Sequence, residues 1–185
     1  MDGQSSYVWY AGNDQVAMFH IDPSRGSEVA THLLGEHFQG CLVTDGYAAY
    51  NAVGAASRQT CLAHLIRKAK EIAEEIALIP EPQQDKQALR FCKGLRRALC
   101  KACELGGKLA DGSLSLQRAA RLLPHLYSLI DIICSTRLAY PKAEKLRQRI
   151  LDPKRVYLYL FTFMTTPGVD PTNNHAERTL RTPVI

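Results

Sequence analysis

Strand-like and helix-like patterns of apolar residues alternate over the first third of the chain. Residues 7–12 and 16–21 are rich in β-branched and aromatic side chains and flank Asn13-Asp14, a pair suited to a tight turn, so they predict a β-hairpin. After the breaker sequence DPSRGS, Ser27 is expected to cap a helix. The apolar face of this helix would hold Val29, Leu33, Leu34 and Phe38.

Two further strands and a helix follow. Residues 40–45 (GCLVTD) are a short apolar run typical of a buried strand, and residues 57–63 (SRQTCLA) predict another. The second of these leads into a helix whose apolar side carries Leu65, Ile66, Ala69, Ile72, Ala73 and Ile76. Strands that alternate with helices indicate an α/β fold.

After residue 80 the pattern is helical only. Residues 86–107 predict a helix that ends at Gly106-Gly107, and residues 114–139 predict a second one, interrupted or kinked near Pro124. The run KRVYLYLFTFM (154–164) is nearly all apolar and is expected to be buried. The tail is expected to form a loop and then a helix that starts at Asn173 or Asn174.

Composition limits the class of protein. The chain has 185 residues, 46% of them hydrophobic, which suffices for one domain or for one domain with a large insertion. Its 23 Lys and Arg against 18 Asp and Glu give a net charge of +5, which permits a polyanionic partner without requiring one. No apolar run reaches membrane-spanning length, the first residues are not a signal peptide, and six cysteines without a secretory signal are typical of reduced thiols. We therefore expect an intracellular protein with no membrane partner.

Two acidic residues are candidates for chemistry. Asp45 would sit at the carboxyl edge of the strand that ends with Leu42 and Val43, where an acid is costly unless it has a partner or a function. The plain alternative is that Asp45 only makes a turn with Gly46 or caps a helix. Glu177 likewise could belong to a capping box, with its carboxylate reaching back to the amide of Asn174.

The cysteines invite a comparison with zinc sites. Cys61-x-x-His64 has the spacing of half a site, and Cys100-x-x-Cys103 could complete four ligands. Cys92 and Cys103 fall on the apolar stripe of their helix, however, and free cysteine is common in protein cores. We therefore favour packed thiols over zinc.

A basic stripe follows one face of the helix predicted over 86–107. Steps of four, three, four and four residues place its members opposite the apolar face. A solvated surface is the plain interpretation, and phosphate contacts that give affinity for DNA without sequence specificity are the functional one. The members of this stripe are Lys86, Arg90, Lys93, Arg97 and Lys101.

Four motifs occur in a characteristic order: DPSRGSEVATHLL (22–34), VTDGYAAYN (43–51), CLAHLIRK (61–68) and NNHAERTLR (173–181). Together they closely resemble the transposases of insertion-sequence family sixty-six, over nearly the whole chain and least over 80–140. The resemblance implies an α/β, RNase H-like mixed sheet with flanking helices and a large all-helical insertion. Residues 1–79 would then form the first part of the core, 80–164 the insertion, and 165–185 the C-terminal helix with a catalytic Glu.

The family also implies a DDE active site that joins DNA ends with divalent metal. One carboxylate lies on the first strand of such a fold, one ends the fourth strand, and one lies on a late helix. Asp45 matches the second of these and Glu177 the third, and both would bind Mg²⁺ or Mn²⁺. Cutting and joining phosphodiesters suits two such ions, which support the attacking and the leaving oxygen.

Basic residues and a histidine would support this site. The resemblance places His64 beside it, to touch DNA or to orient a carboxylate, with a merely packed histidine as the alternative. Arg178 and Arg181 flank Glu177 on its helix and are placed to hold a DNA phosphate near the metals. From the basic stripe, Lys93, Arg97 and Lys101 are expected to contact DNA, whether transposon ends or target.

The first catalytic Asp of the family lies in an Asp-Glu-Thr motif just upstream of the hairpin, a motif for which this chain, beginning at Met1, has no room. Asp2, Asp14 and Asp22 do not match that position. We therefore expect a cytoplasmic, nucleoid-associated bacterial transposase domain that is inactive as this chain. The alternatives are a non-catalytic remnant that only binds DNA or self-associates, and a general RNase H-like nuclease. Loss of the first strand, in the middle of the sheet, predicts self-association or completion by another chain.

Overall fold

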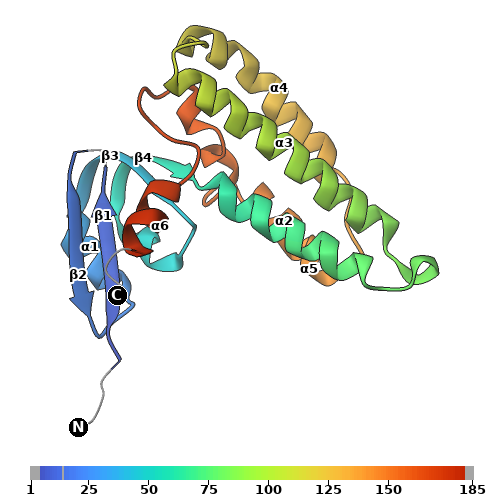
Figure 1. Ribbon diagram of the computed structural model, residues 1–185, viewed down its shortest axis with the longest axis horizontal. Helices are drawn as coiled ribbons and strands as arrows, with labels where there is room; N and C mark the ends of the chain where they lie inside the picture. Colours follow the sequence, from blue (N-terminus) through green and yellow to red (C-terminus); the bar gives the residue numbers. More distant parts are fainter. Residues whose placement is uncertain (1–4, 14, 182–185) are drawn as a thin grey trace.

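The computed structural model describes residues 5–13 and 15–181. Figure 1 shows a small α/β part that contains the strands and a long arm built of helices, with the last helix returning to the α/β part. The strands are β1 (Tyr7–Gly12), β2 (Ala17–Asp22), β3 (His37–Thr44) and β4 (Gly54–Thr60). The α-helices are α1 (Ser27–Leu34), α2 (Leu62–Ala77), α3 (Lys86–Ala110), α4 (Leu116–Cys134), α5 (Pro141–Leu151) and α6 (Asn174–Arg181). Short 3₁₀ helices are η1 (Ala48–Ala52), η2 (Glu81–Gln83), η3 (Tyr157–Tyr159) and η4 (Thr162–Met164).

The predicted hairpin is confirmed. β1 and β2 pair antiparallel along their whole length. Asn13 Oδ1 accepts hydrogen bonds from the backbone N–H groups of Gln15 and Val16, both at 2.9 Å, which is the local bonding that favours asparagine in turns. Asp14, the other residue of the predicted turn, lies outside the described residues.

The helix after the hairpin is displaced and shorter than predicted. Gly26 is the N-cap of α1 and Ser27 its first residue, so the prediction of Ser27 as the cap is wrong by one position. α1 ends at Leu34 because Gly35 has φ +79°, a conformation that glycine adopts without strain. Phe38 consequently lies in β3 and not on the helix.

β3 and β4 form a parallel pair, with Thr44 opposite Thr60. The strands predicted over 40–45 and 57–63 each begin three residues earlier in the structure, and β4 also ends three residues earlier than predicted. The small residues of Gly54-Ala55-Ala56 carry no strand signal in the sequence, which explains why the start of β4 was missed. A small core lies within this α/β part and consists of Trp9, Val29, Ala30, Ala49 and Val53.

The arm holds the larger core. Figure 1 shows α3 running back alongside α2 and α4 alongside α3, while α5 packs against α2. The apolar face predicted for α2 is buried there, so this helix shares its core with α3 to α5 although it directly follows β4. Val156, Leu160, Phe161, Phe163 and Met164 are buried, whereas Leu158 is 59% exposed, so the prediction for the apolar run is confirmed in part. No helix in the described part of the chain combines the length and the apolar character needed to cross a membrane.

Two expected helix breakers do not break their helices. α3 continues through Gly106 and Gly107 to Ala110, so the predicted C-cap is wrong. A Cβ on Gly106 would lie 2.6 Å from Pro171 Cγ, so the glycine permits a close approach between α3 and the loop before α6. Pro124 lies inside α4, which continues to Cys134.

A buried side-chain amide joins the α/β part to the arm. Gln59, in β4, is only 1% exposed. Its Nε2 donates to the carbonyls of Thr60 (2.7 Å) and Leu160 (2.9 Å), and its Oε1 accepts from the N–H of Phe163 (3.1 Å). Because each polar atom of this amide is satisfied, the buried group ties the end of β4 to the segment that follows α5.

The mixed α/β class is confirmed, but a single RNase H-like sheet is not. Within residues 5–13 and 15–181 the strands form two separate pairs, β1–β2 and β3–β4. α6 packs against β1 and so brings the end of the chain back to the strands (Figure 1).

The two adjacent glycines of α3 provide a test of the packing at its end. Gly107→Ala should stabilise the protein by about 1 kcal/mol, because alanine favours helix and its Cβ would meet nothing within 4 Å. Gly106→Ala should be less stable than Gly107→Ala by about 1–3 kcal/mol, because its Cβ overlaps the rigid ring of Pro171. Urea unfolding of both variants measures the difference, and equal stabilisation would contradict the close approach.

Candidate functional site

Asp45 follows the last residue of β3 and makes the turn that leaves the strand. Its Oδ1 accepts a hydrogen bond from the N–H of Tyr47 at 2.8 Å, and Gly46 between them has φ +80°. The structural role that the sequence allowed for Asp45 is therefore present. The hydrogen bond from Tyr47 occupies Oδ1 of Asp45 and leaves Oδ2 without a hydrogen bond within the described residues.

An arginine from the arm reaches the same turn. Arg149, in α5, donates from Nη2 to the backbone carbonyl of Asp45 at 2.9 Å. A side chain on Gly46 would collide with this guanidinium, so glycine suits the position for two reasons. Arg149 was not predicted, and nothing in the sequence relates it to Asp45, which lies 104 positions earlier.

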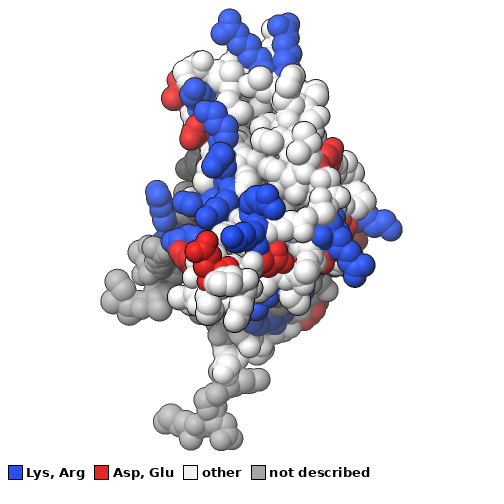
Figure 2. Space-filling view, turned by 90° about the vertical axis from the view of Figure 1, so that its right-hand side faces the viewer, with Lys and Arg blue, Asp and Glu red and all other residues white. Residues whose placement is uncertain are grey.

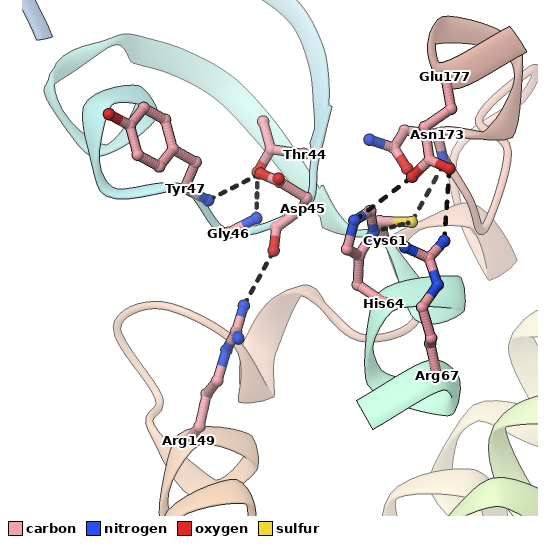
Figure 3. Close-up of polar contacts among 10 residues, drawn as sticks. All are labelled: Thr44, Asp45, Gly46, Tyr47, Cys61, His64, Arg67, Arg149, Asn173 and Glu177. Carbon is pink, nitrogen blue, oxygen red and sulfur yellow. Dashed lines mark hydrogen bonds and ion pairs between the residues drawn. The ribbon is translucent and has the colours of Figure 1, made fainter. Parts of the chain in front are cut away.

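Glu177 lies in the first part of α6 and faces α2 (Figure 3). Its Oε2 is 3.4 Å from Nη2 of Arg67, and its Oε1 is 3.4 Å from Nε2 of His64. Its carboxylate therefore faces α2 and not the Asn174 amide that a capping box would use. Arg67 was missed, although its position one turn after His64 on a helix would have put both on one face.

Cys61 connects the residues around Glu177. Its sulfur accepts a hydrogen bond from the N–H of Asn173 at 3.3 Å and lies 3.3 Å from Nδ1 of His64 (Figure 3). Burial raises the pKa of the Cys61 thiol, so the sulfur keeps its proton at neutral pH. A protonated thiol can donate to Nδ1 of His64.

Three cysteines pack in the core of the arm: Cys92 and Cys134 are buried and Cys103 is partly buried against them. Burial raises the pKa of Cys92 and of Cys134 to about 11 and that of Cys103 to about 12. These thiols therefore keep their protons at neutral pH. Within the described ranges no three His, Cys, Asp or Glu side chains gather closely enough to hold a metal ion.

The two predicted catalytic acids line one cavity of about 880 Å³. Its walls come from β1, β3, α1 and α6, and His64 lies in it as well. Asp170 also lines this cavity and was missed, although its Oδ1 already accepts two bonds from Thr172, at 2.6 and 2.8 Å. A cavity of about 200 Å³ in the arm, beside Phe91 and Leu138, contains none of the predicted residues.

The oxygen donors of the cavity fit part of a divalent-metal site. Asp45 and Glu177 offer the hard oxygen ligands that Mg²⁺ and Mn²⁺ prefer. Glu177 Oε1 is buried and makes no hydrogen bond within the described residues, because its 3.4 Å approach to His64 is an ion-pair distance without hydrogen-bond geometry. Two carboxylates can hold such an ion, but a two-metal site needs more ligands than these.

The other predicted residues lie outside this cavity. Arg178 is exposed on α6, and the side chain of Arg181 lies outside the described part of the chain. Lys93, Arg97 and Lys101 are exposed on α3 in the arm, as the basic stripe predicted. Asp45, His64 and Glu177 thus line one cavity, and the stripe lies on a separate surface.

Comparison with known proteins gives one match. The family model described as "Transposase IS66 family" matches residues 1–185. No curated protein and no solved structure matches the chain significantly.

The two roles of Asp45 can be separated by substitution. Asp45→Asn keeps an oxygen that can accept from the Tyr47 N–H, so its free energy of unfolding should stay within about 0.5 kcal/mol of wild type. Asp45→Ala removes this acceptor and should cost about 1 kcal/mol. Chemical denaturation of both variants measures the difference. An Asn variant as unstable as the Ala variant would show that the turn needs the charge.

Proposed function

Because this chain belongs to the IS66 family of transposases, we propose that it is the catalytic part of a DNA transposase that cleaves and joins DNA strands with divalent metal ions. One observation carries the proposal: Asp45 and Glu177, which are 132 positions apart (177 − 45), line the same cavity.

Asp45 and Glu177 would hold the metal, Mg²⁺ or Mn²⁺. The bound ions would activate the attacking oxygen and stabilise the leaving oxygen of the phosphodiester. Three neighbouring side chains position these two ligands. Arg149 holds the backbone of Asp45, and His64 and Arg67 orient the carboxylate of Glu177.

The number of acidic ligands argues that these 185 residues bind DNA without cutting it. Asp45 and Glu177 supply two carboxylates, and Asp170 does not join them in a metal-binding group within the described residues. A missing ligand displaces the ion from the scissile phosphate, and misplacement of about 1 Å can cost about a hundredfold in rate. The presence of only two such carboxylates among the described residues also favours the second candidate function, a non-catalytic remnant that retains DNA binding or self-association.

The part of the arm that follows α2 suits DNA binding. Residues 80–164 contain 16 Lys and Arg against 7 Asp and Glu, a net charge of +9, whereas the rest of the chain has 7 against 11, a net charge of −4. Figure 2 shows a broken column of Lys and Arg side chains on one face, with some acids among them. Lys86 and Lys101 pair with Glu81 (3.7 Å) and Glu104 (2.8 Å). Within the described residues Lys93 and Arg97 form no ion pair, which leaves them available for phosphates.

Self-association is part of the proposal. Val16, Phe19 and Ile21 of the hairpin are 62%, 45% and 68% exposed. Apolar side chains gathered on a small, two-stranded sheet are typical of a surface that another chain covers.

Metal binding and DNA cleavage test the catalytic proposal. Titration with Mn²⁺, followed by electron paramagnetic resonance, should show a weak site that Asp45→Asn and Glu177→Gln each remove. With Mg²⁺ or Mn²⁺ and labelled ends of its own element, the chain should neither nick nor join DNA. If the chain transfers strands and both variants lose this activity, the proposed inactivity is wrong. If neither variant changes Mn²⁺ binding, the assignment of Asp45 and Glu177 as ligands is wrong.

Charge reversal on α3 tests the DNA surface. The double variant Lys93→Glu/Arg97→Glu should weaken binding to any DNA sequence and lower the slope of log K against log salt by about 1.8, because about 0.9 is lost per phosphate contact. The control Lys145→Glu/Lys154→Glu makes the same change in net charge elsewhere on the arm. Fluorescence anisotropy at several salt concentrations measures both, and equal slopes for the two variants would exclude a specific role for the stripe.

A further inference from the structure

The connection between β2 and α1, DPSRG (22–26), has no role in the site described above, yet hydrogen bonds fix its backbone. Asp22 Oδ1 accepts from the N–H of Ser24 at 2.7 Å. Ser24 Oγ in turn accepts from the N–H of Gly26 at 2.9 Å. Such side-chain bonds to the backbone two residues on hold a turn in one conformation. The residue between the two bonded positions, Arg25, therefore leaves the chain at a defined point.

The side chain of Arg25 contacts two aromatic rings. Its Cζ lies 5.0 Å from the centroid of the Tyr7 ring and 5.1 Å from that of the Tyr47 ring. The hydroxyl of Tyr47 also donates to the backbone carbonyl of Arg25 at 2.8 Å. A guanidinium is planar and stacks on aromatic rings through its face, whereas its N–H donors lie in its plane. The two rings can thus hold the group without using its donors.

These donors have no protein partner in the described part of the chain. Arg25 is exposed, and its guanidinium forms neither an ion pair nor a hydrogen bond with the residues that the structure describes. By contrast, Arg147 in the arm pairs with Glu144 at 2.7 Å. An arginine that is already held loses less side-chain entropy when it binds a ligand. Arg25 is therefore prepared to bind an anion.

Tyr47 connects Arg25 to the candidate site. The N–H of Tyr47 donates to Asp45 Oδ1 at 2.8 Å, while its ring and hydroxyl contact Arg25. Arg149 reaches the same turn from the arm and, within the described residues, also forms no ion pair (Figure 3). The turn that starts with Asp45 at the cavity therefore has the positive charge of two arginines beside it.

A phosphate of DNA is the anion that fits this position. A guanidinium can donate two parallel N–H bonds to one phosphate, which fixes orientation as well as adding affinity. The described lining residues of the cavity include three acids and no Lys or Arg, so the cavity by itself repels a DNA strand. The basic stripe on α3 lies on a separate surface. A cation beside Asp45 would offset the repulsion where the strand has to approach.

We propose that Arg25 binds a backbone phosphate of the DNA strand on which Asp45 and Glu177 act, next to the scissile phosphodiester, and that Tyr7 and Tyr47 orient its guanidinium for this contact. The proposal rests on the proposed function, because it takes DNA as the substrate. Contacts of the α3 stripe would give affinity, whereas the Arg25 contact would set the position of the strand relative to the two acids.

Removal of the charge tests the phosphate contact. Arg25→Gln should weaken binding of a double-stranded oligonucleotide about tenfold and lower the slope of log K against log salt by about 0.9, the amount lost with one phosphate contact. The control Lys70→Gln removes the same charge from α2, where Lys70 pairs with Glu74 at 3.6 Å, and should bind nearly as wild type does. Fluorescence anisotropy at several salt concentrations measures both. Equal effects of the two variants would overturn the proposal.

Substitution of Tyr7 tests the orientation of the guanidinium without a change of charge. Tyr7→Leu removes one of the two rings and should weaken DNA binding about two- to fivefold. Tyr7→Phe keeps the ring and should restore wild-type affinity. Thermal melting of both variants shows that they are folded. Equal affinities of the Leu and Phe variants would overturn the role of the ring.

Trp9 reports where the DNA lies. It is the only tryptophan of the chain, its ring centroid is 6.5 Å from that of Tyr47, and its Nε1 donates to the carbonyl of Ser24 at 3.2 Å. Saturating DNA should therefore change Trp9 fluorescence in the wild type and should leave it unchanged in Arg25→Gln. A change that persists in Arg25→Gln would place the DNA elsewhere and overturn the proposal.

The variant Lys93→Glu/Arg97→Glu separates this site from the proposed function. It should weaken DNA binding and still show the Trp9 change at saturating DNA. If the wild type binds DNA without a Trp9 change, and Arg25→Gln binds as Lys70→Gln does, the phosphate site fails and the proposed DNA function stands. If the wild type binds no DNA, the proposed function fails and the phosphate site fails with it.

Discussion

The hydrogen bonds of Cys61 hold together the three segments that carry the candidate site. Its N–H donates to the carbonyl of Thr44 at 2.8 Å, directly before Asp45. Its sulfur accepts from Asn173 at the start of α6 and approaches His64 on α2. Sulfur is a weak acceptor, so each contact by itself contributes little. Because the side chain is fully buried and shared by all three segments, movement of one segment breaks contacts with the others.

The same junction explains how a long helical arm can be inserted into a small site. The N–H of Leu62, where the arm begins, donates to the carbonyl of Pro171, where the chain returns, at 2.9 Å. The arm therefore leaves the α/β part and returns to it at one point, where its two ends are hydrogen-bonded to each other. Gly106 lets α3 approach this point closely, and Gln59 fixes the segment after α5 to β4.

The sequence predicts the elements that local patterns determine and misses the contacts that the tertiary fold creates. Strand-type residues around a turn pair located the hairpin, and apolar periodicity located the buried face of α2. The asparagines at 173 and 174 marked the start of α6, and strand-end position singled out Asp45. The end of α3 was wrong because Gly106 serves a packing contact with Pro171, which no local signal reveals. Arg149 and Asp170 were missed for the same reason, since their relation to Asp45 exists only in the folded chain. The assignments of Asp45 and Glu177 to metal and of the stripe to DNA stay predictions.

Acidic and basic side chains are distributed unevenly between the cavity and the arm. The cavity brings Asp45, Asp170 and Glu177 together without a Lys or Arg among its described lining residues, so by itself it repels DNA phosphates. The excess of basic residues lies on the arm. At physiological salt the Debye length is about 8 Å, so the arm can attract DNA only where its side chains approach the phosphates directly. The proposed function therefore assigns affinity for DNA and chemistry on DNA to separate surfaces. Under the proposed function, loss of a carboxylate from the cavity would therefore impair chemistry on DNA and leave affinity for DNA largely unchanged.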